Sequence, residues 1–240
     1  MSRVDLVTRC IGEVSHMVTG ERAAEGVTGP RAGVKYAVEA IGTFFVVFTI
    51  GTSVRSGSSL APLAIGAVVV GMSYAGGHLS GGHYNPAVTV AVLVRRRIGL
   101  CDALVYWIAQ LGAGVLAAPV VGAIVKPAQV NSLTLSGHTV VAALVVELLF
   151  TFALAYVVLN VATSKAHPDN SFYGLAIGLV VVAGAVAVGG ISGAAFNPAV
   201  VIGGALIGLL PWTTLIYLVV ELLAGVAAGL SFRALNPDDV

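Results

Sequence analysis

Long apolar runs, separated by short polar or glycine-rich segments, dominate the chain after residue 35. An α-helix rises 1.5 Å per residue, so about 20 apolar residues are enough to cross the hydrocarbon core of a bilayer. We predict that each of the longer runs forms a membrane-spanning helix: 36–54, 60–76, 100–125, 139–162, 172–188 and 212–232. Two further runs, 86–94 and 198–209, are too short to span and are expected to be buried, re-entrant segments.

The two halves of the chain resemble each other. Segment 78–88 parallels segment 190–200, and the equivalent residues Asn85 and Asn197 lie 197 − 85 = 112 positions apart. A glutamate also recurs near the start of each half, at Glu39 and Glu147. Three predicted spans separate equivalent points, and this odd number forces the second half to insert upside down. An inverted repeat places a solute site near the midplane, between the halves.

Composition agrees with a membrane protein, because 58% of the residues are hydrophobic and only 10% are charged. Soluble domains average about 25% charged residues. The net charge of +1 gives no reason to expect a nucleic-acid partner. Cys10 and Cys101 are too few for a disulfide framework and are expected to be ordinary small apolar residues. No nucleophile–base pair or metal-ligand cluster is evident, so we expect neither an enzyme nor a cofactor.

Basic residues are distributed unequally between the predicted loops. If the N-terminus is cytoplasmic, only Arg55 and Lys126 lie on the opposite side, against ten basic residues on the cytoplasmic side. This bias predicts that both termini are cytoplasmic, including the tail 233–240, and we expect the cell membrane as the location. The run Arg95-Arg96-Arg97 is interpreted as an anchor that contacts anionic lipid headgroups.

Each short apolar run begins with the same tripeptide, Asn85-Pro86-Ala87 in the first half and Asn197-Pro198-Ala199 in the second. Proline is favoured at the first position of a helix and asparagine at the N-cap before it. Each motif therefore predicts a short helix whose N-terminus reaches the midplane. The asparagine amides can donate to a passing oxygen atom, and the helix dipoles oppose the passage of cations.

With Glu39-Ala40-Ile41-Gly42-Thr43-Phe44 and Ser80-Gly81-Gly82-His83, these paired motifs make the chain resemble the major intrinsic protein family over residues 36–232. The resemblance implies an all-α membrane protein with six transmembrane helices and two re-entrant half-helices, in halves of about 36–125 and 139–232. It also implies one pore per subunit and a homotetramer in membrane lipid. Glu39 and Glu147 would brace the re-entrant loops, and intramembrane carboxylates do need partners. A ladder of backbone carbonyls would be formed by Gly81, Gly82, His83, Gly193, Ala194 and Ala195.

The sequence departs from the family pattern at the selectivity filter. Most aquaporins carry arginine directly after the second motif, where this chain has Val200. Family spacing assigns the other filter positions to Ile65, Ala185 and Ala194. The uncharged ring predicts a passive channel for water that also passes small neutral solutes such as ammonia, urea, hydrogen peroxide and glycerol. The alternatives are a dedicated solute facilitator, and an ion-coupled transporter, for which only Glu39 and Glu147 are counted as intramembrane acids.

Two further hypotheses concern control of the channel. His83 lies near the expected pore, where protonation could gate flow, although loop hydrogen bonds could equally hold it in place. In segment 1–35, Val4, Val7, Ile11, Val14 and Val18 share one helical face. Such a helix would rest on the membrane surface or plug the pore mouth, and disorder is the third alternative.

Overall fold

The computed structural model describes residues 32–126 and 137–239. The hypotheses on the N-terminal helix concern residues 1–31, which lie outside this described part. Cys101 is disulfide-bonded, which corrects the expectation of two unpaired cysteines. The only other cysteine of the chain, Cys10, also lies outside the described residues.

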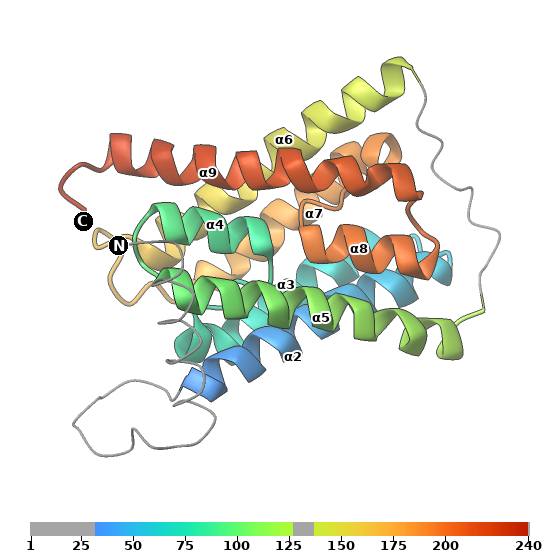
Figure 1. The fold of residues 1–240 in the computed structure, drawn as a ribbon, viewed down its shortest axis with the longest axis horizontal. Helices are drawn as coiled ribbons and strands as arrows, with labels where there is room; N and C mark the ends of the chain where they lie inside the picture. The colour runs from blue at the N-terminus through green and yellow to red at the C-terminus, as the bar shows by residue number, and fades with distance from the viewer. Residues whose placement is uncertain (1–31, 127–136, 240) are drawn as a thin grey trace, which may run out of the picture.

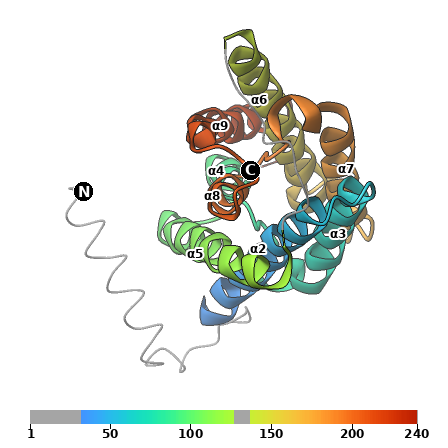
Figure 2. The same ribbon diagram turned by 90° about the vertical axis from the view of Figure 1, so that its right-hand side faces the viewer.

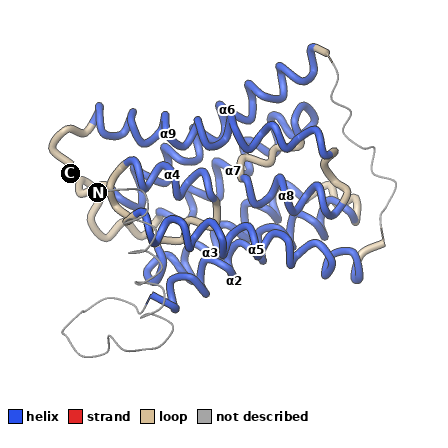
Figure 3. The backbone as a smooth tube through the Cα atoms, in the orientation of Figure 1, coloured by secondary structure: helices blue, strands red, loops and turns tan. Residues whose placement is uncertain are grey.

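Every regular element of the described chain is helical (Figures 1 and 3). The first half contains α2 (Ala32–Arg55), α3 (Ala61–Ser80), the short α4 (Pro86–Val94) and α5 (Leu100–Ile124). The second half contains α6 (His138–Val158), α7 (Tyr173–Ser192), the short α8 (Pro198–Ile207) and α9 (Tyr217–Leu235). A π-helical turn, Leu159–Thr163, extends α6, and a 3₁₀ turn, Trp212–Ile216, precedes α9. Six of these helical segments are long and apolar enough to cross a membrane, which confirms the predicted spans.

The second and fifth spans end four residues later than predicted, at Ser80 and Ser192. The predicted ends lie beside glycine pairs, Gly76-Gly77 and Gly189-Gly190. Within a membrane, however, the backbone groups have no water to bond, so the helical hydrogen bonds continue through those glycines. Each helix stops at a glycine in the left-handed region, Gly81 at φ 90° and Gly193 at φ 89°. A residue without Cβ adopts this conformation without steric cost.

Viewed end-on, the six spans form an open ring, and the two short helices lie between α5 and α9, where they complete it (Figure 2). The packing repeats between the halves, since α2 packs on α3 and α5 as α6 packs on α7 and α9. Each short helix packs against the last span of the opposite half, α4 on α9 and α8 on α5. The halves are therefore interlocked, and the N-termini of α4 and α8 lie inside the ring.

Two glycines permit this interlocking, at equivalent positions of α5 and α9. A Cβ on Gly114 would lie 2.7 Å from the carbonyl oxygen of Ala199, and one on Gly225 would lie 2.3 Å from that of Ala87. Both alanines belong to the repeated tripeptides. The spans thus contact the backbone of the short helices directly, with no side chain between them.

Candidate functional site

The two short helices begin with the same capping geometry. Asn85 and Asn197 both have extended backbone, with φ of −155° and −159°. The side-chain oxygen of Asn85 accepts from the N–H of Ala87 at 2.8 Å, and that of Asn197 accepts from the N–H of Ala199 at 2.9 Å. Proline follows at the first helical position in each case. The N-caps are those that the sequence predicts.

The asparagine amides also connect the two halves. Asn85 donates from Nδ2 to the carbonyl of Phe196 at 2.8 Å, and Asn197 donates to the carbonyl of Tyr84 at 3.0 Å. An amide NH₂ group carries two N–H donors, so each asparagine keeps one for another acceptor. Tyr84 and Phe196 have φ of 47° and 49°, a region that costs a non-glycine residue about 1–3 kcal/mol. The crossed hydrogen bonds help to hold this strained backbone.

Glu39 holds the loop before α4. Its carboxylate accepts four hydrogen bonds, from the Ser80 hydroxyl at 2.7 Å, the N–H of His83 at 2.9 Å, the N–H of Tyr84 at 2.7 Å and Gln110 Nε2 at 2.8 Å. Four donors compensate for the desolvation of a fully buried carboxylate.

Glu147 makes the equivalent contacts before α8. Its two oxygens accept from the N–H of Ala195 at 3.0 Å and from the N–H of Phe196 at 2.8 Å. Glu39 and Glu147 thus each accept from two consecutive backbone N–H groups in the loop before a short helix.

A narrow cavity of about 50 Å³ lies where the capped ends meet. Pairs of residues about 112 positions apart line it from both halves: Asn85 and Asn197, Val88 and Val200, Ile65 and Ile177, Val69 and Val181, and Gly82 and Ala194. Of the expected filter residues, Ile65, Ala194 and Val200 therefore reach this cavity. Ala185 is not among its lining residues, and α7 reaches it instead through Ile177 and Val181.

Sequence reasoning missed the lining residues on the other side of the paired asparagines, among them Ser73, Val88 and Ile177. The internal repeat could have identified these residues. Its 112-residue offset relates Val88 to Val200, Ile177 to Ile65 and Ser73 to Ala185, and these three partners are predicted filter positions. Ser73 is 2% exposed, and its hydroxyl has no partner among the described residues. Its hydroxyl is one of the few polar side-chain groups beside the cavity.

The expected carbonyl ladder lies in the non-helical links between the spans and the short helices. Gly81, Gly82 and His83 link α3 to α4, and Gly193, Ala194 and Ala195 link α7 to α8. Gly82, His83, Ala194 and Ala195 line the narrow cavity, whereas Gly81 lines the wider one beside it.

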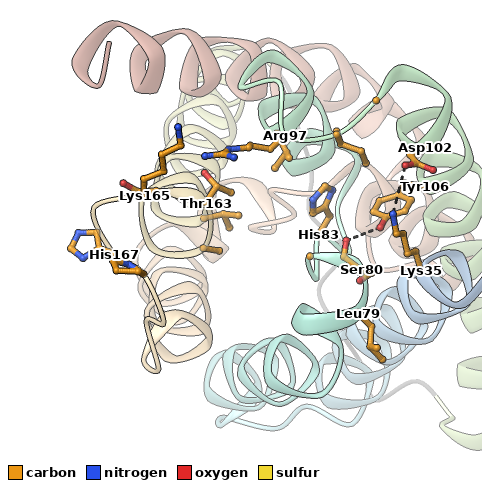
Figure 4. A pocket seen from close by; sticks show the side chains of 18 of the residues that line it. Lys35, Leu79, Ser80, His83, Arg97, Asp102, Tyr106, Thr163, Lys165 and His167 are labelled. Atoms are coloured by element: carbon orange, nitrogen blue, oxygen red, sulfur yellow. Dashed lines mark hydrogen bonds and ion pairs between the residues drawn. The ribbon is translucent and has the colours of Figure 1, made fainter. Parts of the chain in front are cut away.

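That wider cavity, of about 620 Å³, opens at the end of the molecule where α2 begins, and we call it the vestibule (Figure 4). Its wall carries Lys35, Arg97, Lys165 and His167, together with Asp102 and Asp169. His83 lines both cavities. Its ring Nδ1 lies 3.1 Å from the Thr89 hydroxyl, and the ring packs edge-on against Tyr106. These contacts fix the ring at the junction between the two cavities.

The prediction that Arg95 contacts lipid headgroups is wrong. Its side chain is 1% exposed, and its Nη2 lies 2.6 Å from Asp239 Oδ1 while its guanidinium carbon lies 4.5 Å from the centre of the Phe232 ring. Asp239 Oδ2 also accepts from the Ser164 hydroxyl and the N–H of Lys165, both at 2.9 Å. Partial burial alone would raise the pKa of Asp239, but these hydrogen bonds and the Arg95 charge together lower it. The tail is thereby fixed to the end of α4 and to the segment after α6.

A third intramembrane acid corrects the sequence-based count of two. Glu221 lies inside α9 and is fully buried, and its Oε1 accepts from the N–H of Asn197 at 3.0 Å. The equivalence of 106–111 with 217–222, YWIAQL with YLVVEL, would have identified it as the counterpart of Gln110. None of the three glutamates lines the narrow cavity.

Six spans in a ring completed by two opposed, asparagine-capped half-helices define an integral membrane channel. A sequence model described as "Major intrinsic protein" matches residues 27–232, and the chain belongs to this family. Members of the family are channels and not enzymes, so the chain is a multi-pass membrane protein that passes small solutes.

Similar proteins include both aquaporins and a glycerol facilitator. Aquaporin NIP2-1 of Oryza sativa subsp. japonica is 36% identical, over 84% of this chain and 70% of its own length. Glycerol uptake facilitator protein-like 6 of Lactiplantibacillus plantarum is 39% identical, over 72% of this chain and 83% of its own. The X-ray structure of the aquaglyceroporin from Plasmodium falciparum superposes with a TM-score of 0.68 at 21% identity, covering 85% of this chain and 95% of that one. This last likeness concerns the fold.

Proposed function

We propose that the channel conducts water together with small neutral solutes such as ammonia, urea and hydrogen peroxide. The observation that carries the proposal is the lining of the narrow cavity, which includes no formally charged side chain among the described residues. Val200 stands at the place of the filter arginine of most aquaporins and is one of these lining residues. The remaining lining is mostly aliphatic, with a few hydrogen-bonding groups, as a pathway for small neutral molecules requires.

Ion exclusion in this proposal depends on the two half-helices. Each N-terminus carries about half a positive charge, and both are directed at the cavity from opposite sides. A cation entering there would lose its hydration and meet two positive helix ends, whereas a neutral dipole can exchange hydrogen bonds with the free amide N–H of Asn85 and of Asn197. Without the arginine, these dipoles supply the main electrostatic barrier.

The names of the relatives leave a second candidate, because one of them is called a glycerol uptake facilitator. A dedicated solute facilitator would pass little water. The mostly aliphatic lining favours the broader function, since its described side chains include few that could replace the hydration of a polyol. An ion-coupled transporter is disfavoured because the buried acids lie outside the narrow cavity.

We further propose a homotetramer in membrane lipid, with the vestibule, both termini and the tail on the cytoplasmic side of the cell membrane. The predicted excess of basic residues on that side supports the orientation, and Lys35, Arg97 and Lys165 at the vestibule agree with it. His83 stands at the entrance from the vestibule to the narrow cavity, so it is the residue through which acid would change flow. A His83→Gln variant with the same pH profile of permeability as the wild type would contradict this gating role.

The test of the solute range is Val200→Arg, with Val200→Leu as the size control without charge. Both variants are reconstituted in vesicles, and water and urea permeabilities are measured by stopped-flow light scattering. Arginine should lower urea permeability far more than water permeability, because it narrows the passage and occupies it with a hydrated charge. Equal urea permeability in wild type and Val200→Arg would contradict the assignment of this position to the filter.

A further inference from the structure

The last spans of the two halves, α5 and α9, occupy equivalent places around the half-helices. Tyr106 donates from its hydroxyl to the carbonyl of Ser80 at 2.6 Å, and Tyr217 donates to the carbonyl of Ser192 at 3.2 Å. The positions differ by 217 − 106 = 111 and 192 − 80 = 112, so these contacts are related by the repeat. The same relation pairs Gln110 with Glu221, an amide with a carboxyl group.

In the first half, the amide of Gln110 is a donor. Its Nε2 lies 2.8 Å from Glu39 Oε2 and 3.0 Å from the Thr89 hydroxyl, and Gln110 is fully buried. With the three other donors described above, this bond leaves Glu39 satisfied as a carboxylate. The half-helix of the first half is therefore held by a single buried carboxyl group, and donors surround it.

In the second half, the equivalent place holds a second acid. Glu221 is fully buried beside Glu147, because the two carboxyl groups accept from consecutive backbone N–H groups: Glu147 from Ala195 and Phe196, and Glu221 from Asn197. Its Oε1 accepts from the N–H of Asn197, but its Oε2 has no donor among the described residues. The counterpart of Thr89 is Val201, which has no hydroxyl group to offer.

No basic side chain of the described residues pairs with either acid. The ion pairs of the described residues involve Asp102 and Asp239 and neither of these glutamates. The titratable neighbour on α9, Tyr217, gives its hydroxyl to the Ser192 carbonyl. Two adjacent carboxylates in a low-dielectric interior repel each other and lose their hydration, so both cannot be ionised.

We propose that Glu221 is a neutral carboxylic acid that donates its proton to the Glu147 carboxylate and accepts from the N–H of Asn197. The O–H group of Glu221 would donate a hydrogen bond to Glu147, just as the side-chain N–H of Gln110 donates one to Glu39. Glu221 is thus a positioning residue for Asn197, and the pair is a proton-binding site behind the second half-helix. The pair lies outside the narrow cavity, so its proton is not on the solute pathway. This inference does not depend on which solute the channel carries.

Infrared spectroscopy of the purified full-length protein, in a detergent free of ester groups, tests the protonation directly. At neutral pH the wild type should show the carbonyl absorption of a protonated carboxyl, shifted by D₂O and absent from Glu221→Gln. The matched variant Gln110→Glu places a second acid beside Glu39 and should add a second such absorption. A wild-type spectrum without this absorption, or one that Glu221→Gln leaves unchanged, would overturn the proposal.

Substitutions test the positioning role separately. Glu221→Leu leaves the N–H of Asn197 without an acceptor, which should shift the folding equilibrium by about tenfold or more and lower water permeability per channel. Glu221→Gln should keep the wild-type stability and water permeability, since its amide donates to Glu147 and its oxygen accepts from Asn197. If Glu221→Gln is as unstable and impermeable as Glu221→Leu, the side chain acts as a carboxylate and the proposal is wrong.

Discussion

Replacing Gly114 with alanine tests the direct contact between α5 and the second half-helix. The new Cβ would lie 2.7 Å from the carbonyl oxygen of Ala199, whereas a Cβ in ordinary van der Waals contact lies 3.4–4 Å from its neighbour. The two helices must therefore separate by 3.4 − 2.7 = 0.7 Å or more. The obstacle is backbone, so it cannot rotate away as a flexible side chain would.

The expected magnitude follows from two opposing effects. Overpacking of this kind costs about 1–3 kcal/mol, while alanine in place of glycine within a helix stabilises by about 0.5–1 kcal/mol. Gly112→Ala provides the matched control, because it lies on the same helix and its Cβ would meet nothing within 4 Å. Only the helix-propensity gain applies to the control. The two variants should thus differ in stability by about 1–3 kcal/mol.

Thermal unfolding in detergent and water permeability in vesicles measure the two consequences. Gly114→Ala should unfold at a lower temperature than Gly112→Ala. It should also conduct less water per channel, because Ala199 donates its N–H to the capping oxygen of Asn197 at 2.9 Å. If the two variants have equal stability and permeability, α5 does not contact the half-helix as described.

Three other substitutions test separate parts of the structure. Gly225→Ala should destabilise more than Gly114→Ala in the same unfolding assay, because its Cβ would lie only 2.3 Å from the carbonyl oxygen of Ala87. Glu39→Gln should lower the free energy of unfolding by about 2–6 kcal/mol. The amide oxygen can accept only two of the four donors, and each unpaired donor costs about 1–3 kcal/mol. Unfolding at the wild-type temperature would contradict the bracing role. Asp239 has a lowered pKa, so its contribution to stability is complete above its ordinary pKa of about 3.9 and is lost as the pH falls through the lower folded value. Asp239→Asn should therefore be less stable than the wild type at pH 7, and the difference should shrink on acidification below about pH 4; a pH-independent difference would contradict this.

The spans and half-helices could be predicted because their signals are local. Run length identifies membrane helices, and Asn-Pro at the start of a short apolar run identifies a capped helix that cannot span. The internal repeat then fixes the inverted arrangement of the halves. The helix ends were predicted less well: α2 begins at Ala32 and α9 ends at Leu235, each beyond the predicted span. The spans α3 and α7 continue past glycine pairs to Ser80 and Ser192, because burial in a membrane overrides the usual effect of glycine on a helix.

The site was predicted less completely, because its geometry depends on contacts between residues that are far apart in the sequence. Family spacing brought Ile65, Ala194 and Val200 to the narrow cavity but also named Ala185, which is not among its lining residues. The run of three arginines suggested lipid contact, yet Arg95 pairs with Asp239, 144 residues away. Glu221 was overlooked because a single acid in an apolar span gives no local indication of its partner.

Stopped-flow shrinkage of vesicles containing the purified chain, in an impermeant osmolyte, tests the proposed water pathway most directly. These vesicles should shrink clearly faster than protein-free vesicles, with a low activation energy and no accompanying proton conductance. The same vesicles should also admit urea faster than bare lipid does. Shrinkage no faster than that of bare lipid, with protein that is folded and inserted, would contradict the proposal that water passes between the two capped half-helices.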